Sequence, residues 1–234
     1  MLDATYRATL AYSGAGFAGY SRQPGLYTVE DAVRAALALL PAEARALAVA
    51  GRTDRGVSAT GQVISLRLRP ALPPEALREA LDGVDPNLAC PEVRVVPRAF
   101  HAGFSATGRR YAYLLPDLDP ALVRRVDRLL APLVGRRCFS AFARDTRPGQ
   151  STVRRLSEAR LLPAHEGERP AWAVLLTADG FLRKQVRILV ATALREAEAG
   201  APEDRLLALA AAGERAATAP PAPPEPLRLI SVLY

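Results

Sequence analysis

The chain has 234 residues, half of them hydrophobic, and a formal net charge of +7. This length can bury a substantial core, as one large domain or as two small ones. The sequence contains no run of about eighteen apolar residues and no cleavable signal pattern, so we expect a cytoplasmic protein that does not span a membrane.

Metal-binding patterns are also missing from the sequence. Cys90 and Cys138 are the only cysteines, and their separation fits neither a disulfide framework nor a metal-binding spacing. His101 and His165 are the only histidines, which excludes a histidine-rich site, and no acidic cluster suggests a magnesium site. We therefore expect no metal.

Arginine supplies nearly all of the positive charge, since Lys184 is the single lysine. Thirteen arginines and five acidic residues lie between Arg98 and Arg160, and the rest of the chain is close to neutral. A concentrated basic region suits a phosphate-rich partner, because the arginine guanidinium forms bidentate hydrogen bonds to phosphates and stacks on bases. The alternative is that the arginine and alanine content reflects a coding bias.

The first part of the chain interleaves predicted strands and helices. A strand over 5–12 leads into a glycine-rich loop, and Thr28 caps a predicted helix over 29–40, with Asp31 placed as in a capping box. In the last strand of this part, Tyr111 and Tyr113 share one face. The other predicted elements are strands over 46–50 and 61–69, a helix over 73–81, and strands over 92–96, 99–105 and 110–115.

The second part repeats this order loosely. The patterns predict a helix over 120–133, strands over 152–162 and 172–178, helices over 181–199 and 202–213, a proline-rich connector over 220–226, and a strand over 227–234. We therefore predict an α+β fold of two similar lobes, residues 1–106 and 107–234, each an antiparallel or mixed sheet covered by helices on one face.

The most informative motif is Gly51-Arg52-Thr53-Asp54-Arg55-Gly56-Val57, between two predicted strands. The backbone of a tight turn would hold Asp54 close to Arg52 and Arg55. A carboxylate near fixed cations stays ionised and can act as a nucleophile or a base. The alternative is an aspartate that only hydrogen-bonds its own turn.

This motif resembles the Gly-Arg-Thr-Asp-x-Gly-Val signature of the tRNA pseudouridine synthase A (TruA) family. The resemblance continues in order through nearly the whole chain. The further matching segments are 12–20 with Gln23-Pro24, 100–107 with 109–113, 139–142, 180–187 and 222–224.

The resemblance implies that the protein converts uridine to pseudouridine in the anticodon arm of tRNA, at positions 38–40. It implies a homodimer and an active-site cleft between the two lobes. The reaction needs one carboxylate near the ribose and a wall for the detached base, but neither a metal nor a redox cofactor. By resemblance Asp54 is the catalytic aspartate, and whether it attacks C1′ or removes a proton from C2′ stays open.

The resemblance also implies substrate-binding residues. Tyr111 would pack against the target base, Arg187 would pair with the aspartate, and Arg52 would hold the flipped-out nucleotide. Arg109 and Arg110 would contact phosphates. The alternatives are an ordinary strand tyrosine, solvated arginines, and charges that protect a strand edge.

Three positions depart from the family pattern. Ser58 stands in place of the usual histidine, Gly103 in place of the usual arginine, and the chain reads Pro-Glu-Pro-Leu-Arg over 224–228. These departures concern RNA binding and target-site choice, whereas the reaction class rests on Asp54, Tyr111 and Arg187, which match the family. Two other functions stay open. One is an RNA-binding protein or tRNA chaperone that has lost activity, and the other is the same chemistry on another RNA.

Overall fold

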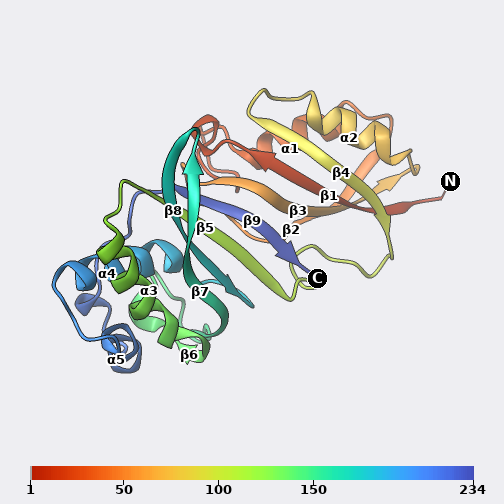
Figure 1. Cartoon of the computed structure of the whole chain (residues 1–234). Helices are drawn as coiled ribbons and strands as arrows, with labels where there is room; N and C mark the ends of the chain where they lie inside the picture. Colours follow the sequence, from red (N-terminus) through yellow and green to blue (C-terminus); the bar gives the residue numbers. More distant parts are fainter. Residues whose placement is uncertain (1) are drawn as a thin grey trace. The chain divides into compact units, whose positions relative to one another are not determined.

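The computed structural model of the chain describes residues 2–234, which form an α+β fold of two compact units (Figure 1). The first unit contains the chain up to Thr107 together with Arg228–Tyr234, and the second contains Gly108–Leu227. No helix within residues 2–234 combines the length and the apolar character needed to cross a membrane.

The sheet of the first unit is mixed. Its strands are β1 (Ala4–Tyr12), β2 (Glu43–Val49), β3 (Ser58–Arg69), β4 (Leu88–Val96) and β9 (Leu227–Leu233). β1 lies between β3 and β4 and is antiparallel to both. On the other edge of β3, β2 pairs antiparallel with its second half, and β9 pairs parallel with its first two residues.

One face of this sheet forms the core of the first unit. Tyr6, Ala8 and Leu10 of β1 are fully buried, as the two-residue period of a strand predicts. Helices α1 (Val29–Ala38) and α2 (Pro74–Asp82) cover this face (Figure 1). The predicted capping box of α1 is confirmed: Thr28 Oγ1 accepts a hydrogen bond from the Asp31 amide, and the Thr28 amide donates to the Asp31 carboxylate.

The last strand belongs to the first unit, whereas the sequence places it in the second lobe. β9 runs so close to β3 that a Cβ atom added at Gly61 would lie 2.2 Å from the carbonyl oxygen of Ile230. The Thr107 amide also donates to the carbonyl oxygen of Leu233. Both contacts join residues far apart in sequence, which is why local patterns did not indicate them.

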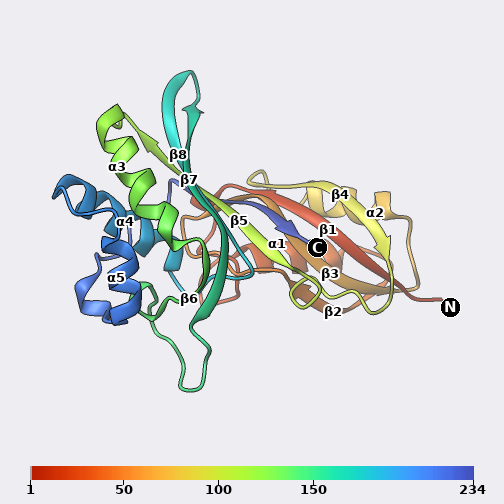
Figure 2. The same ribbon diagram turned by 60° about the horizontal axis from the view of Figure 1, so that its bottom comes forward.

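The second unit has an antiparallel sheet and three longer helices. Its strands are β5 (Gly108–Pro116), β6 (Gly135–Cys138), β7 (Val153–Glu166) and β8 (Arg169–Ala178). β8 pairs with both β5 and β7, and β6 pairs with β7. Figure 2 shows the tip of the β7–β8 hairpin projecting away from the helices.

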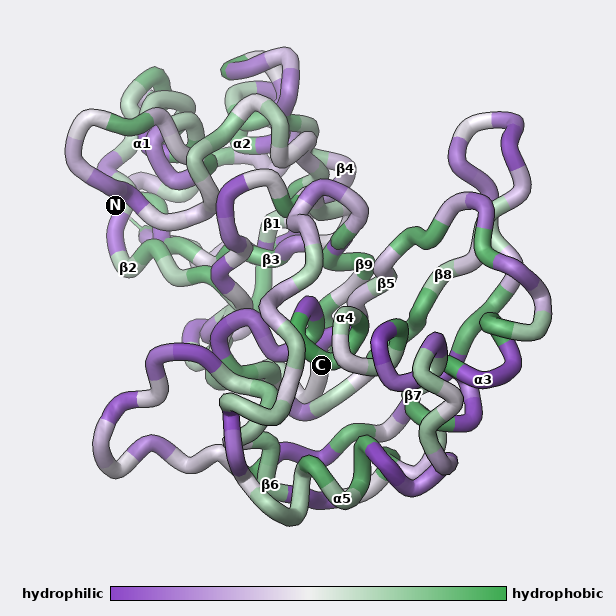
Figure 3. The backbone as a smooth tube through the Cα atoms, turned by 90° about the vertical axis from the view of Figure 1, so that its left-hand side faces the viewer, coloured by the Kyte–Doolittle hydropathy of each residue, from purple (hydrophilic) through white to green (hydrophobic). Residues whose placement is uncertain are grey.

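The helices of the second unit are α3 (Pro120–Leu130), α4 (Gln185–Glu198) and α5 (Arg205–Ala212), and they pack against one another. α3 also contacts β7, and α4 contacts β5. The apolar side of α3 is buried and its three arginines are exposed. Figure 3 colours the backbone of this helix by the hydropathy of its residues.

Two sequence predictions about single elements are wrong. Residues 99–105 form turns, because the His101 ring nitrogen Nδ1 accepts hydrogen bonds from the amides of Gly103 and Phe104. The helix predicted from residue 181 begins at Gln185, because Lys184 has a left-handed φ of 61°. A single left-handed residue interrupts a right-handed helix.

We expect Gly61→Ala to lower the free energy of unfolding by about 1–3 kcal/mol, because the added methyl group meets backbone that cannot rotate away. Gly180→Ala is the control: its Cβ would lie 3.6 Å from the nearest atom, and the change should stay within about 0.5 kcal/mol. Denaturant unfolding measures both. Equal effects would show that β9 can shift away from β3 at little cost.

Candidate active site

Asp54 lies in the short loop between β2 and β3 of the first unit. The Val57 amide donates to the Asp54 carbonyl oxygen at 3.1 Å, and Gly56 adopts a φ of 82°, so residues 54–57 form a tight turn. Asp54 is half-buried, whereas the neighbouring Arg52 and Arg55 are exposed. The turn therefore fixes the backbone of the aspartate and leaves two cations accessible beside it.

A buried polar cluster, formed by Tyr12, Thr53 and Gln62, holds this loop against the sheet. Gln62 is fully buried, and its Nε2 donates to the Gly51 carbonyl oxygen at 2.6 Å and to the Tyr12 hydroxyl at 3.2 Å. The hydroxyl groups of Tyr12 and Thr53 lie 2.8 Å apart. Burial raises the pKa of Tyr12 to about 12, which keeps its hydroxyl protonated. The cluster thus fixes the residues directly before Asp54.

The glycine-rich loop after β1 holds the same segment from another side. The Tyr20 amide donates to the Thr53 carbonyl oxygen at 3.1 Å, and a Cβ at Gly14 would lie 2.4 Å from the backbone of Gly56. Ser58 joins the two loops, since its Oγ accepts a hydrogen bond from the Gly14 amide at 3.0 Å. The serine in place of the family's usual histidine therefore has a structural contact of its own.

Tyr111 lies on β5 of the second unit, opposite Leu176 of β8. It is 9% exposed, and its ring meets the ring of Phe181 edge-on at a centroid distance of 5.3 Å. Tyr113 faces the same side; burial raises its pKa, and the nearby charge of Arg187 opposes this rise. Tyr111 therefore sits in an aromatic and apolar setting, as a residue that packs against a base requires.

Arg187 lies in the first turn of α4 and is half-buried. Its Nε donates to the Ala222 carbonyl oxygen at 2.6 Å, and the Ala222 amide donates back to the Arg187 carbonyl oxygen at 3.1 Å. Arg187 thus ties the proline-rich connector to α4, which differs from the solvated helix arginine of the alternative interpretation.

The adjacent Arg109 and Arg110 have different surroundings, because consecutive strand residues point to opposite faces. Arg110 forms an ion pair with Glu158 at 3.1 Å, and its Nε donates to Thr177 Oγ1 at 3.1 Å. Arg109 donates to the carbonyl oxygen of Asp179 at 3.0 Å and is on the Tyr111 side of the strand. Because the Glu158 carboxylate already pairs with Arg110, Arg110 is the weaker phosphate-binding candidate of the two.

Within the first unit the structure holds Asp54 in a tight turn, with the exposed Arg52 two residues before it. Within the second it places Tyr111 beside Phe181, and Arg187 near Tyr113. Sequence reasoning missed the role of Gln62, although a glutamine directly before the apolar Val63 and Ile64 of a predicted strand was a visible signal. Across residues 2–234, no three His, Cys, Asp or Glu side chains gather as metal ligands.

Comparisons with known proteins place the chain in a family. Residues 130–234 match a family model described as tRNA pseudouridine synthase. The chain is 37% identical over 248 residues to tRNA pseudouridine synthase A of Frankia casuarinae, covering 97% of this chain and 88% of that protein. It is 32% identical over 256 residues to the protein of the same name from Lactiplantibacillus plantarum, covering 98% and 94%.

We expect Tyr12→Phe to loosen the Asp54 loop by breaking the polar cluster. The substitution removes the two hydrogen bonds of the Tyr12 hydroxyl, to Thr53 and to Gln62, and each buried hydrogen bond is worth about 1 kcal/mol. The amides of Tyr20 and Val57 should therefore exchange hydrogen at least about tenfold faster. Tyr6→Phe is the matched control in the same strand, since the Tyr6 hydroxyl bonds only the backbone of Leu72. Equal acceleration at both amides in the two variants would contradict a specific role for the cluster.

Proposed function

Because the chain belongs to the tRNA pseudouridine synthase A family, we propose that it isomerises uridine to pseudouridine in the anticodon arm of tRNA. The observation that carries this proposal is the position of Asp54, in a glycine-flanked turn fixed by the Tyr12–Thr53–Gln62 cluster. A carboxylate held by backbone on both sides is pre-organised to act on a bound nucleotide.

The reaction breaks the bond between N1 of uracil and C1′ of the ribose, rotates the base, and joins C5 to C1′. The C5 proton then leaves, and N1 gains a proton, so the product is an isomer of the substrate. Asp54 would start the reaction either by attacking C1′ or by removing the C2′ proton. Both routes require an ionised carboxylate at a fixed position beside the ribose.

The other residues support binding of a flipped-out uridine. Tyr111, with Phe181 at its edge, offers an aromatic surface on which a detached base can stack. The exposed Arg52, two residues before Asp54, can hold the flipped nucleotide through its phosphate. This proposal also includes the role that the resemblance implies for Arg187, which is to pair with the aspartate. It further includes phosphate contacts of Arg109 and Arg110.

We also propose that the protein works as a cytoplasmic homodimer and needs neither metal nor cofactor. Two other functions make different predictions: a tRNA chaperone would bind without turnover, and a synthase for another RNA would leave tRNA unmodified. Mapping pseudouridines in RNA from cells with and without the protein separates all three outcomes.

Asp54→Asn should abolish pseudouridine formation while tRNA affinity stays within about threefold. The amide has nearly the same shape but can neither attack C1′ nor remove a proton, and losing a negative charge does not weaken binding to a polyanion. Asp117→Asn, an exposed residue with a φ of 53° that asparagine tolerates, is the control. Turnover of the Asp54 variant within tenfold of wild type would exclude Asp54 as the catalytic group.

Two substitutions at Tyr111 separate stacking from proton transfer. Tyr111→Leu should lose about 1–3 kcal/mol of transition-state stabilisation, roughly five- to a hundredfold in single-turnover rate, because the ring is gone. Tyr111→Phe keeps the ring, so a slow step in this variant assigns a proton-transfer role to the hydroxyl. Tyr113→Phe, on the same face, is the control. If Tyr111→Leu keeps the wild-type rate, Tyr111 has no role in the active site and is an ordinary strand residue.

A further inference from the structure

We propose that an arginine-lined pocket of the first unit binds backbone phosphates of the RNA at a distance from Asp54. The pocket has a volume of about 310 Å³ and is lined by Asp3, Arg45, Arg67, Arg69 and Arg98. This inference rests on the proposed function, because it takes RNA as the ligand.

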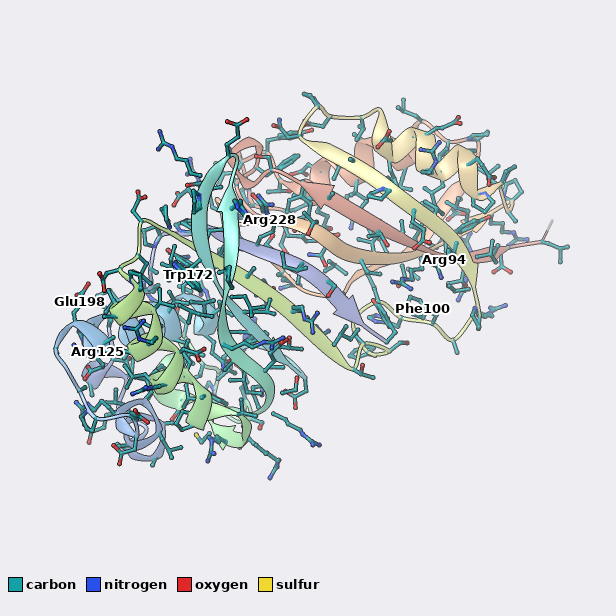
Figure 4. All side chains as sticks on the ribbon, viewed as in Figure 1. Arg94, Phe100, Arg125, Trp172, Glu198 and Arg228 are labelled. Carbon is teal, nitrogen blue, oxygen red and sulfur yellow. The ribbon has the colours of Figure 1, made fainter. Side chains whose placement is uncertain are left out.

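The pocket lies on the face of the sheet opposite the helices. Leu66 and Leu68 of β3 are buried in the core, so Arg67 and Arg69 point to the other side. Arg45 of β2 is paired directly with Arg67 across the ladder, which places their side chains on the same face. The face continues with Arg7 of β1 and its ladder partner Arg94 of β4, which Figure 4 labels.

Acidic residues neutralise this cluster only in part. Asp3 lies 3.6 Å from Arg67 Nε and 4.0 Å from Arg98 Nη1, both longer than the roughly 2.7–2.9 Å of a charge-assisted hydrogen bond. Arg45 bonds Glu43 outside the pocket lining. Four guanidinium groups against two carboxylates leave a local excess of two positive charges. A phosphate would accept hydrogen bonds that Asp3 does not supply to these arginines.

The pocket lies far from the Asp54 loop within the same unit. The loop ends where β3 begins, at Ser58, and Arg67 is nine residues further along the strand. At about 3.3 Å per residue, this separation is about 30 Å. Phosphates of one duplex strand are about 3.4 Å apart along the axis, so the pocket would contact RNA on the order of ten nucleotides from the target uridine. Full-length tRNA extends that far, whereas a hairpin of the anticodon stem and loop is too short.

The test compares two double variants that each remove two positive charges from the first unit. Arg69→Ala with Arg98→Ala changes the pocket. Arg34→Ala with Arg78→Ala changes an exposed arginine on α1 and a half-buried one on α2. With full-length tRNA, the pocket variant should bind about tenfold or more weakly at 0.1 M salt, and its log–log salt slope should fall by about two. The control should change the slope by less than about 0.5, and the hairpin should not distinguish the two variants.

Asp3→Asn adds a test in the opposite direction. Removing this carboxylate should tighten binding of full-length tRNA severalfold if the pocket holds a phosphate, whereas a purely structural ion pair predicts no gain. Equal losses in the two double variants, or an equal loss with the hairpin, would overturn the inference. Binding is measured apart from turnover, so wild-type protein that binds tRNA without modifying it would refute the proposed function and leave the phosphate pocket standing.

Discussion

The Asp54 loop depends on three buried polar side chains that satisfy one another. Gln62 has no exposed surface, so its amide must find its hydrogen bonds inside the protein, and it finds them on the Gly51 carbonyl and the Tyr12 hydroxyl. A buried group without a partner costs about 1–3 kcal/mol, which penalises any other path of the loop. The same interactions that stabilise the fold therefore select the position of the aspartate.

A single strand connects the Asp54 loop and the arginine pocket, the two parts of the first unit that we propose to contact RNA. β3 begins directly after the Asp54 turn and ends at the arginine pocket, and its apolar residues anchor both ends to the same core. A paired central strand is among the least mobile elements of a fold. The backbone of this strand thus fixes the spacing between the aspartate and the pocket, as the proposed contact of both with one RNA requires.

Sequence patterns correctly predicted those features of the fold that depend on interactions between neighbouring residues. The helix start at Thr28 and Asp31 needs only neighbouring residues, and the alternation that buries Tyr111 and Tyr113 needs only one strand. The assignment of the last strand to the first unit depends on a close approach between Gly61 and Ile230, about 170 residues apart, which no local pattern contains. The turns at 99–105 arise because a histidine ring accepts two amide hydrogens, a choice that strand propensity does not describe.

Two of the three departures from the family pattern lie at the two ends of the Asp54 loop. Ser58, at its exit, bonds the Gly14 amide, and Gly103 packs against the end of β2 at its entrance, where a Cβ would lie 3.2 Å from the Val49 carbonyl oxygen. A larger residue at 103 would have to push that carbonyl by a few tenths of an ångström. β2 ends at Val49 and β3 begins at Ser58, so both positions lie where the backbone enters and leaves the Asp54 loop.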